Sequence, residues 1–467
     1  MSNTSRAHPS PISDAASRRL ALNALCFGFF LVVLDTTALN LAADSIRREW
    51  SGSVTELQSV VNSYTLVFAA FLLSGGALGD RLGARCSYEL GMVVFTIASL
   101  LCSVSPGLSA LVALRALQGL GAAVMLPASL SVLAHIYPTA DGRSQAVGHW
   151  ATVVSLAFAV GPILGGIMTH FLGWRGIFAA NVPVGIVALA MVRAWVPPTP
   201  PGEVRPISWR SQLLASAGLF CMSFALIEVG GSSWQSERVW CPLLASVVLN
   251  LWFIRADRRY LTPLLPPLLF ADVTFSMSVG IGLVLNFGVY GILFAEPLYL
   301  QDVRHFSALA SGVLLLPLTV VPTLTTRVMA RHSTRHNLKL RLVLGLLLGM
   351  AGGAVLCAAI GATGPSWTVL GLFLMGASLG FVMPAITTGA LATAPMALAG
   401  RASSILNAAR QVGGSLGVAL MGSLFQARAS TGLRYSFGVA AGAFAIMAWL
   451  SWRRLPVVAD TPAWVRA

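Results

Sequence analysis

The chain has 467 residues, of which 56% belong to the hydrophobic set AVILMFWYC and only 10% are charged. A soluble domain carries about 25% charged residues, so this composition argues against a soluble protein and indicates one that is covered by lipid. The net charge of +14 comes from basic residues scattered between long apolar runs, a pattern that argues against nucleic-acid binding and agrees with membrane orientation.

Long apolar stretches recur along the chain. A hydrocarbon core about 30 Å thick needs roughly 20 helical residues per crossing. On this scale the sequence predicts an all-α membrane protein with fourteen transmembrane helices. The predicted spans are 20–43, 57–79, 88–104, 108–134, 146–172, 176–195, 213–229, 240–254, 273–298, 308–328, 340–360, 367–390, 403–425 and 435–450.

The basic residues divide unequally between the two sides that these spans create. With the N-terminus in the cytoplasm, 21 of the 30 Lys and Arg residues fall in cytoplasmic segments and seven in external ones, while Arg115 and Arg410 lie within spans. Cytoplasmic loops carry the excess of Lys and Arg in membrane proteins. We therefore expect a multi-pass protein of the cell membrane with both termini in the cytoplasm.

Two distant segments resemble each other. QGLGAAVMLPASL aligns with MGASLGFVMPAIT, which pairs Gly119 with Gly376 at an offset of 257 residues, and the same offset pairs Gly165 with Gly422. Duplicated halves around a midplane site are typical of secondary transporters, although chance similarity between glycine-rich helices is the alternative. The predicted organisation is a cytoplasmic tail (1–19), a six-helix half (20–195), two inserted helices (196–260), a second six-helix half (261–452) and a cytoplasmic tail (453–467).

The loop between the second and third predicted spans reads G-A-L-G-D-R-L-G-A-R. We expect Gly76 to let the helix end pack closely, Gly83 to permit the chain reversal, and Asp80 to accept hydrogen bonds from a neighbouring helix N-terminus or arginine. Together with Arg81 and Arg85 these residues form a candidate gating motif, in which a charge contact breaks and re-forms. The alternative is a structural turn with incidental charge.

This loop is similar to the signature of the major facilitator superfamily, G-x-L-a-D-r-x-G-r-k. Other segments resemble elements of its drug:proton antiporters with fourteen spans. These segments are LDTTALNLA (34–42), RALQGLGAA (115–123), GPILGG (161–166) with WRGIFAANVP (174–183), and ILNAARQVGGSLG (405–417). The resemblance implies the major facilitator fold, with two six-helix halves and two inserted helices. Ala84 and Cys86 depart from the signature, and the loop after span 308–328 lacks its Gly and Asp.

One acidic and one basic residue stand out as candidates for proton coupling. A carboxylate within a span costs about 2.5–3.5 kcal/mol on the insertion scale, so it is a functional candidate. Asp35 and Arg115 lie at comparable depth in helices that can be neighbours within one half, and the resemblance assigns functional roles to both positions. Burial favours a neutral carboxyl and a nearby cation favours a charged one, so relative movement would load or release a proton. A static ion pair is the alternative.

Two further groups of residues are candidate site residues. Gly161, Pro162, Gly165 and Gly166 form the antiporter motif, where small residues permit close helix packing and proline bends the helix. We expect a tight seal along the pathway there, or ordinary helix packing. The candidates for a substrate cavity are Asn40, Gln118, Glu228, Asn286, Glu296, Asn407 and Arg410.

The acidic and basic cavity candidates each have several interpretations. Glu228 and Glu296 would favour cationic substrates if they face the cavity, or they are solvated at the outer vestibule. Arg410 binds an anion, neutralises a carboxylate or is structural.

The expected function is proton-coupled efflux of drugs or antibiotics, with export of small amphipathic compounds by alternating access. We expect no cofactor, because the proton gradient drives transport and no G-x-x-x-x-G-K-[ST] sequence is present. We expect no metal site, because the cysteines and histidines lack ligand spacing. The partners are the substrate, protons and the lipid bilayer, with no nucleic acid, and we expect a monomer.

Two other functions remain open at this point. Proton-coupled uptake of a metabolite is the alternative within transport, because GPILGG favours export by resemblance only. A membrane-embedded enzyme or sensor would need a clustered set of His, Asp, Glu or Ser within spans. Only His149 of the seven histidines falls clearly in a span, so we expect no enzyme and no catalytic residues.

The gating motif leads to a first prediction. Asp80→Asn removes the charge and keeps the shape, so it should slow the conformational switch more than it weakens binding. Initial transport rates at several substrate concentrations should show a lower maximal rate with little change in half-saturation. Lost affinity with an unchanged maximal rate would contradict a role for Asp80 as a latch.

Overall fold

The computed structural model describes residues 15–201, 208–232, 235–260, 263–331, 338–362, 364–395 and 398–456, and helices make up most of them. Most of both predicted tails lies outside these residues. The longer helices are α1 (Ala15–Glu49), α2 (Val54–Leu82), α3 (Ala84–Ser103), α4 (Leu108–Ile136), α5 (Ala140–Leu172), α6 (Trp174–Trp195), α7 (Trp209–Gly231), α8 (Glu237–Arg258), α10 (Val273–Leu298), α12 (Leu316–Arg331), α13 (Leu338–Ala359), α14 (Ser366–Ala392) and α15 (Ala399–Arg454). The shorter elements are α9 (Pro267–Phe270), the π-helix η1 (Tyr299–Val303) and α11 (Ala308–Leu314).

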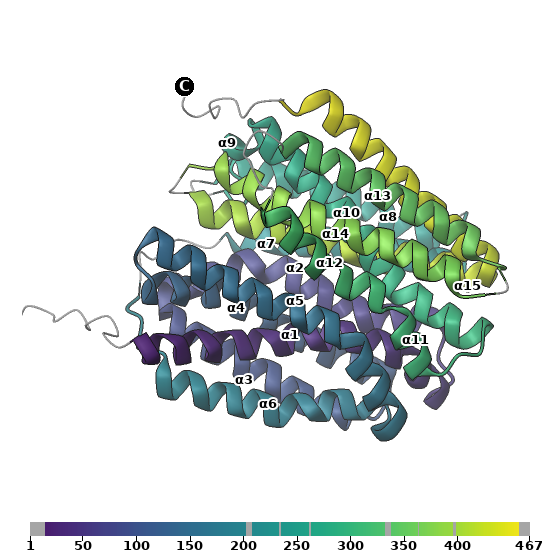
Figure 1. Ribbon diagram of the computed structural model, residues 1–467, viewed down its shortest axis with the longest axis horizontal. Helices are drawn as coiled ribbons and strands as arrows, with labels where there is room; N and C mark the ends of the chain where they lie inside the picture. Colours follow the sequence, from purple (N-terminus) through teal and green to yellow (C-terminus); the bar gives the residue numbers. More distant parts are fainter. Residues whose placement is uncertain are drawn as a thin grey trace, which may run out of the picture.

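The helices form two groups that pack against each other. Helices α1 to α6 contact mainly one another, and so do α10 and α12 to α15, whereas the short α11 contacts mainly α5 of the first group. In Figure 1 the first group, coloured purple to blue, forms the lower part of the molecule, and the second, coloured green to yellow, forms the upper part. The groups meet where α2 packs on α15, α5 packs on α11 and α12, and α1 packs on α10. Helix α7 contacts both α2 and α15 at this interface between the groups, which we call the seam, and α8 packs on α7.

Twelve helices in the described part of the chain are long and apolar enough to cross a membrane. One of them, α15, has 56 residues and combines two helices across a kink at Arg428 and Ala429, where the backbone is not helical. At about 1.5 Å per residue it is more than twice as long as a hydrocarbon core is thick. The 29-residue α2 is not among the twelve. The prediction of a helical membrane protein is confirmed, whereas the count of fourteen spans stays a prediction.

One predicted span differs from the structure in its interior. The expected continuous helix 308–328 is divided into α11 and α12 at Leu315. Pro317 has no backbone N–H and its ring would collide with the preceding turn, which accounts for the break. Another proline, Pro297, lies near the end of α10, where the chain continues into η1 and carries Asp302 towards α1.

Glycines set the spacing between neighbouring helices in both groups. A Cβ on Gly119 of α4 would overlap the backbone carbonyl of Tyr64 in α2, and one on Gly376 of α14 would lie 2.6 Å from the carbonyl of Pro317 in α12. The two glycines that align in the sequence repeat therefore make the same kind of contact in the two groups. Side chains larger than hydrogen would push these helix pairs apart.

This packing yields a prediction about stability. Gly119→Ala and Gly376→Ala should each destabilise the protein by about 1–3 kcal/mol, because the added methyl group meets backbone that cannot rotate away. The melting temperature in detergent measures the effect. Gly442→Ala is the matched control, because a Cβ there has open space around it. Equal melting temperatures for all three variants would contradict the close helix contacts.

Candidate functional site

A buried carboxylate occupies the centre of the first helix group. Asp35 of α1 is 0% exposed and accepts three hydrogen bonds. The donors are Arg115 Nη1 to Oδ2 at 2.5 Å, Gln118 Nε2 to Oδ1 at 3.1 Å and Asn181 Nδ2 to Oδ1 at 2.7 Å. The charge of Asp35 is therefore balanced by one cation and stabilised by two amides within the membrane region, as a buried ion requires.

Arg115 has partners besides Asp35. Its Nη1 also donates to Gln118 Oε1 at 2.5 Å, so one nitrogen is shared between the carboxylate and the amide. Its guanidinium lies over the ring of Tyr64, 4.3 Å from the centroid, and Gln118 Nε2 donates to Ser99 Oγ at 2.9 Å. A guanidinium over an aromatic face gains cation–π stabilisation. We call Asp35, Arg115, Gln118, Asn181, Ser99 and Tyr64 the Asp35 cluster.

Five helices of the first group supply the cluster: α1, α2, α3, α4 and α6. The sequence indicated Asp35 and Arg115, and it suggested Gln118 only as a cavity residue. It missed Asn181, Ser99 and Tyr64 as partners. Asn181 lies in the segment WRGIFAANVP, whose single asparagine was the available signal. Neutral polar residues are common in membrane helices, so nothing in the sequence distinguished Ser99 or Tyr64.

The antiporter motif lies beside this cluster and against the seam. Gly161 and Gly165 of α5 pack directly on Thr37 and Ala38 of α1, where a Cβ on either glycine would overlap α1 atoms. Gly166 faces the other helix group, and its Cβ would lie 3.0 Å from the carbonyl oxygen of Ala308 in α11. The motif therefore joins α5 to α1 on one side and to the second group on the other.

Helix α11 of the second group also packs closely on α5 at the antiporter motif. A Cβ on Gly312 of α11 would lie 2.7 Å from the carbonyl oxygen of Pro162. Further along the seam, Thr319 Oγ1 of α12 donates to the carbonyl of Ala159 at 3.2 Å. These contacts pack α5 of the first group closely against α11 and α12 of the second.

Polar contacts close the seam at one end of the bundle. Arg47 at the end of α1 donates to Asp302 of η1 at 2.6 Å and to Asp44 at 2.8 Å. Nearby, Gln58 of α2 donates to the backbone carbonyl of Val418 in α15 at 2.9 Å. This is the end that the sequence predicts to be extracellular.

The candidate gating motif forms the turn between α2 and α3. Gly83 has φ 84°, so the expected chain reversal is confirmed there, and a Cβ would overlap the carbonyl of Thr199. Arg85 donates through its backbone N–H to Thr199 Oγ1 at 2.8 Å and through Nε to Glu89 at 2.8 Å. Arg81 lies in the last turn of α2. The side chain of Asp80 lies outside the described residues.

One expectation for this motif is wrong. A Cβ on Gly76 would meet only Pro127, at an ordinary 3.7 Å. The close approach falls on the preceding residue, Gly75, where a Cβ would overlap the carbonyl of Ala123 in α4. The helical rotation of about 100° between neighbours turns Gly75 towards α4 and Gly76 away from the closest contact.

The remaining cavity candidates do not join the Asp35 cluster. Asn40 and Asn286 are 2% and 3% exposed. Arg410 Nη1 donates to Asn407 Oδ1 at 2.9 Å in α15, and no described carboxylate pairs with it. The two residues form a separate polar pair in the second group.

The two acidic candidates have different environments. Glu228 in α7 is partly buried. Glu296 in α10 is 1% exposed, and its buried Oε2 has no hydrogen-bond partner. Solvation of Glu296 at an outer vestibule, one of the two interpretations of this residue, does not hold in this structure.

A helical bundle with an ion pair buried between its spans and a glycine-packed seam between two helix groups defines a multi-pass membrane transporter. The chain belongs to the Major Facilitator Superfamily, whose family model matches residues 25–418. Membership in this transporter family makes the chain a transporter rather than an enzyme, and it requires no cofactor.

Among curated relatives, the methylenomycin A resistance protein of Bacillus subtilis (strain 168) is 33% identical over 432 residues, which cover 92% of each chain. The multidrug resistance protein Stp of Mycobacterium tuberculosis (strain CDC 1551 / Oshkosh) is 30% identical over 87% of this chain and 76% of its own. The crystal structure of a POT family transporter in complex with 5-aminolevulinic acid superposes with a TM-score of 0.71 at 14% identity, covering 93% of this chain and 96% of the other. This structural similarity supports the fold alone.

The buried ion pair yields a prediction about energetic coupling. Asp35→Asn and Arg115→Gln should each destabilise the protein by about 3–5 kcal/mol, because each leaves one buried charge without its partner. The double variant should lose less free energy of unfolding than the two single variants lose together, with a difference of about 0.5–3 kcal/mol. Thermal unfolding in detergent measures the stability of the unmodified protein, of each single variant and of the double variant. As a control, Asp35→Asn is combined with Arg238→Gln at the exposed start of α8, and the stability losses of these two variants should add. If the losses of Asp35→Asn and Arg115→Gln add equally well, the two residues are not coupled.

Proposed function

We propose that this chain is a proton-coupled efflux transporter that exports small amphipathic compounds by alternating access. The observation that carries the proposal is the buried pair of Asp35 and Arg115, a titratable carboxylate inside a membrane span next to a cation. The names of its relatives, which are resistance and export proteins, support export rather than uptake.

The shared hydrogen bonds of Arg115 suggest how Asp35 takes up and releases a proton. When a proton neutralises Asp35, Arg115 loses its counter-ion but keeps Gln118 Oε1, which it already contacts at 2.5 Å. The guanidinium therefore has a neutral acceptor and the Tyr64 ring during the protonated stage. When Arg115 returns to the carboxylate, the proton leaves. Each proton that moves inward across 100 mV provides about 2.3 kcal/mol for export.

Helix α1 is the element that links this proton site to the seam. Asp35 lies two residues before Thr37, which packs on Gly161 of the antiporter motif. The same helix carries Arg47, which contacts Asp302 across the seam. A shift of α1 on protonation would therefore act on its packing against α5 within the first group and on the Arg47–Asp302 contact between the two groups. We propose that the seam is closed on the outer side in this structure, with the transport pathway facing the cytoplasm.

The finer topology is also part of the proposal. Counting α15 twice because of its kink, and adding α2, brings the twelve apolar helices to fourteen spans. The domains are those expected from the sequence, with α7 and α8 as the inserted pair between residues 196 and 260. Both termini are cytoplasmic, in the cell membrane, as the distribution of arginines indicates.

The remaining site assignments and partners follow from this function. Gly76, Asp80, Arg81, Gly83 and Arg85 form the gating turn. Asn40, Glu228, Asn286, Glu296, Asn407 and Arg410 are candidates for the substrate pathway. The partners are a small-molecule substrate, protons and the lipid bilayer, and the transporter works as a monomer.

The proton site is tested by Asp35→Asn, which keeps the shape of the side chain and removes the titratable group. Substrate uptake into everted membrane vesicles, energised by a pH gradient, should fall to background while the protein remains inserted. Glu237→Gln, at the exposed start of α8, is the control and should transport normally. Normal pH-driven export by Asp35→Asn would refute the proton-carrier role, and movement of substrate in the opposite direction by the unmodified protein would favour uptake.

A further inference from the structure

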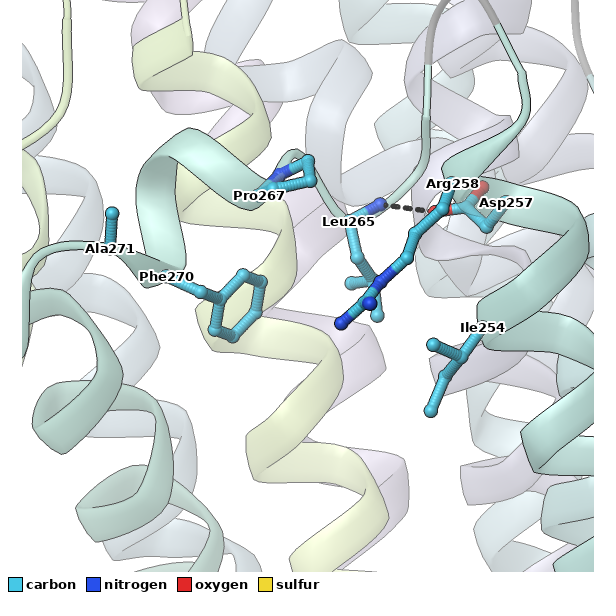
Figure 2. A pocket seen from close by; sticks show the side chains of 7 residues that line it. All are labelled: Ile254, Asp257, Arg258, Leu265, Pro267, Phe270 and Ala271. Carbon is cyan, nitrogen blue, oxygen red and sulfur yellow. Dashed lines mark hydrogen bonds between the residues drawn. The ribbon is translucent and has the colours of Figure 1, made fainter.

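A pocket separate from the Asp35 cluster lies at the end of the inserted helix α8. Its volume is about 420 Å³, and its lining includes Ile254, Asp257 and Arg258 of α8 together with Leu265 and Phe270 near α9 (Figure 2). Its walls therefore come from α8 and from the segment that leads into the second helix group. Sites for small molecules have volumes of about 300–1,000 Å³, so this pocket is large enough for the polar head of a ligand or for a compact molecule.

The charges at this pocket are unbalanced. Asp257 is 2% exposed, and its carboxylate accepts the backbone N–H groups of Leu264 at 2.8 Å and Leu265 at 2.9 Å. Arg258 is exposed and forms no ion pair with any described residue. Figure 2 shows its side chain reaching into the pocket between Leu265 and Ile254. The carboxylate of Asp257 thus accepts hydrogen bonds from the backbone instead of pairing with Arg258, and the Arg258 guanidinium is available to an anion.

An apolar surface leads from the pocket along α8. Leu244, Val248 and Leu251 are 60%, 60% and 48% exposed, and Ile254 and Arg258 follow at the same three- and four-residue spacing. These residues therefore form one stripe on the helix. At about 1.5 Å per residue the stripe is about 21 Å long, and half a hydrocarbon core is about 15 Å thick. The stripe is long enough to hold an acyl chain below a headgroup at Arg258.

We propose that this pocket binds an anionic phospholipid, with the phosphate at Arg258 and one acyl chain along the stripe from Ile254 to Leu244. Arg255 and Arg259, both exposed, add positive charge beside it. A free phosphate has no use for the apolar stripe, and a zwitterionic lipid gains less from three arginines. The lipid would connect α8, whose contacts are mainly with α7, to the segment before α10. This inference does not depend on which substrate the transporter carries.

The experiment measures the melting temperature of the full chain in detergent with added phosphatidylglycerol, phosphatidylcholine or inorganic phosphate. Phosphatidylglycerol should raise the melting temperature, whereas the other two additions should not. Arg258→Gln should lose most of the rise, and native mass spectrometry should show about fivefold weaker retention of phosphatidylglycerol, since one basic residue near the membrane surface contributes about 1 kcal/mol. Arg238→Gln, at the opposite end of α8, should behave as the unmodified protein.

A second variant separates the pocket from general charge. Leu265→Trp fills the pocket and leaves all three arginines in place, so it should also lose the response to phosphatidylglycerol; it serves as the test if Arg258→Gln does not fold. Equal stabilisation by phosphatidylcholine would overturn the proposal. So would an equal effect of inorganic phosphate, or a full response in both Arg258→Gln and Leu265→Trp.

Discussion

A charge buried between membrane helices persists only where the protein supplies its partners, and the ion pair of Asp35 and Arg115 sets this requirement for the first helix group. The pair is satisfied only when α1, α4 and α6 come together, because Asn181 and Gln118 complete the hydrogen bonds of the carboxylate. The guanidinium further requires the ring of Tyr64 from α2. The site therefore both arranges these helices and depends on their arrangement.

Helix α1, which carries Asp35, extends this constraint to the rest of the molecule. Close packing of Gly161 and Gly165 on α1 leaves little freedom for α1 to move without α5, and α5 in turn contacts α11 and α12 of the second group. At its end, α1 is bound across the seam through Arg47 and Asp302. The glycines of α5 thus hold α1 at close range, through the side chain of Thr37 and the backbone of Ala38.

Much of this arrangement could be predicted from the chain itself. Long apolar runs require helices in lipid, because no water is present there to satisfy an open backbone. Asp35 and Arg115 were recognisable because charges in such runs are rare. The glycine pair Gly119 and Gly376 was visible as a repeat, and both prove to be sites of close helix contact. The division between α11 and α12 was not anticipated, although Pro317 marks it.

Composition and periodicity determined that this chain is a helical membrane protein, and its motifs indicated the family. These properties are local, because each depends on the residues of one helix and its loops. Only the tertiary structure decided that Gly75 rather than Gly76 makes the close contact, that Asn181 completes the carboxylate site, and that Glu296 is buried. The reason is that partners and burial depend on helix rotation and on neighbours far away in the sequence, and an apolar helix carries little polar pattern to reveal which face meets which neighbour.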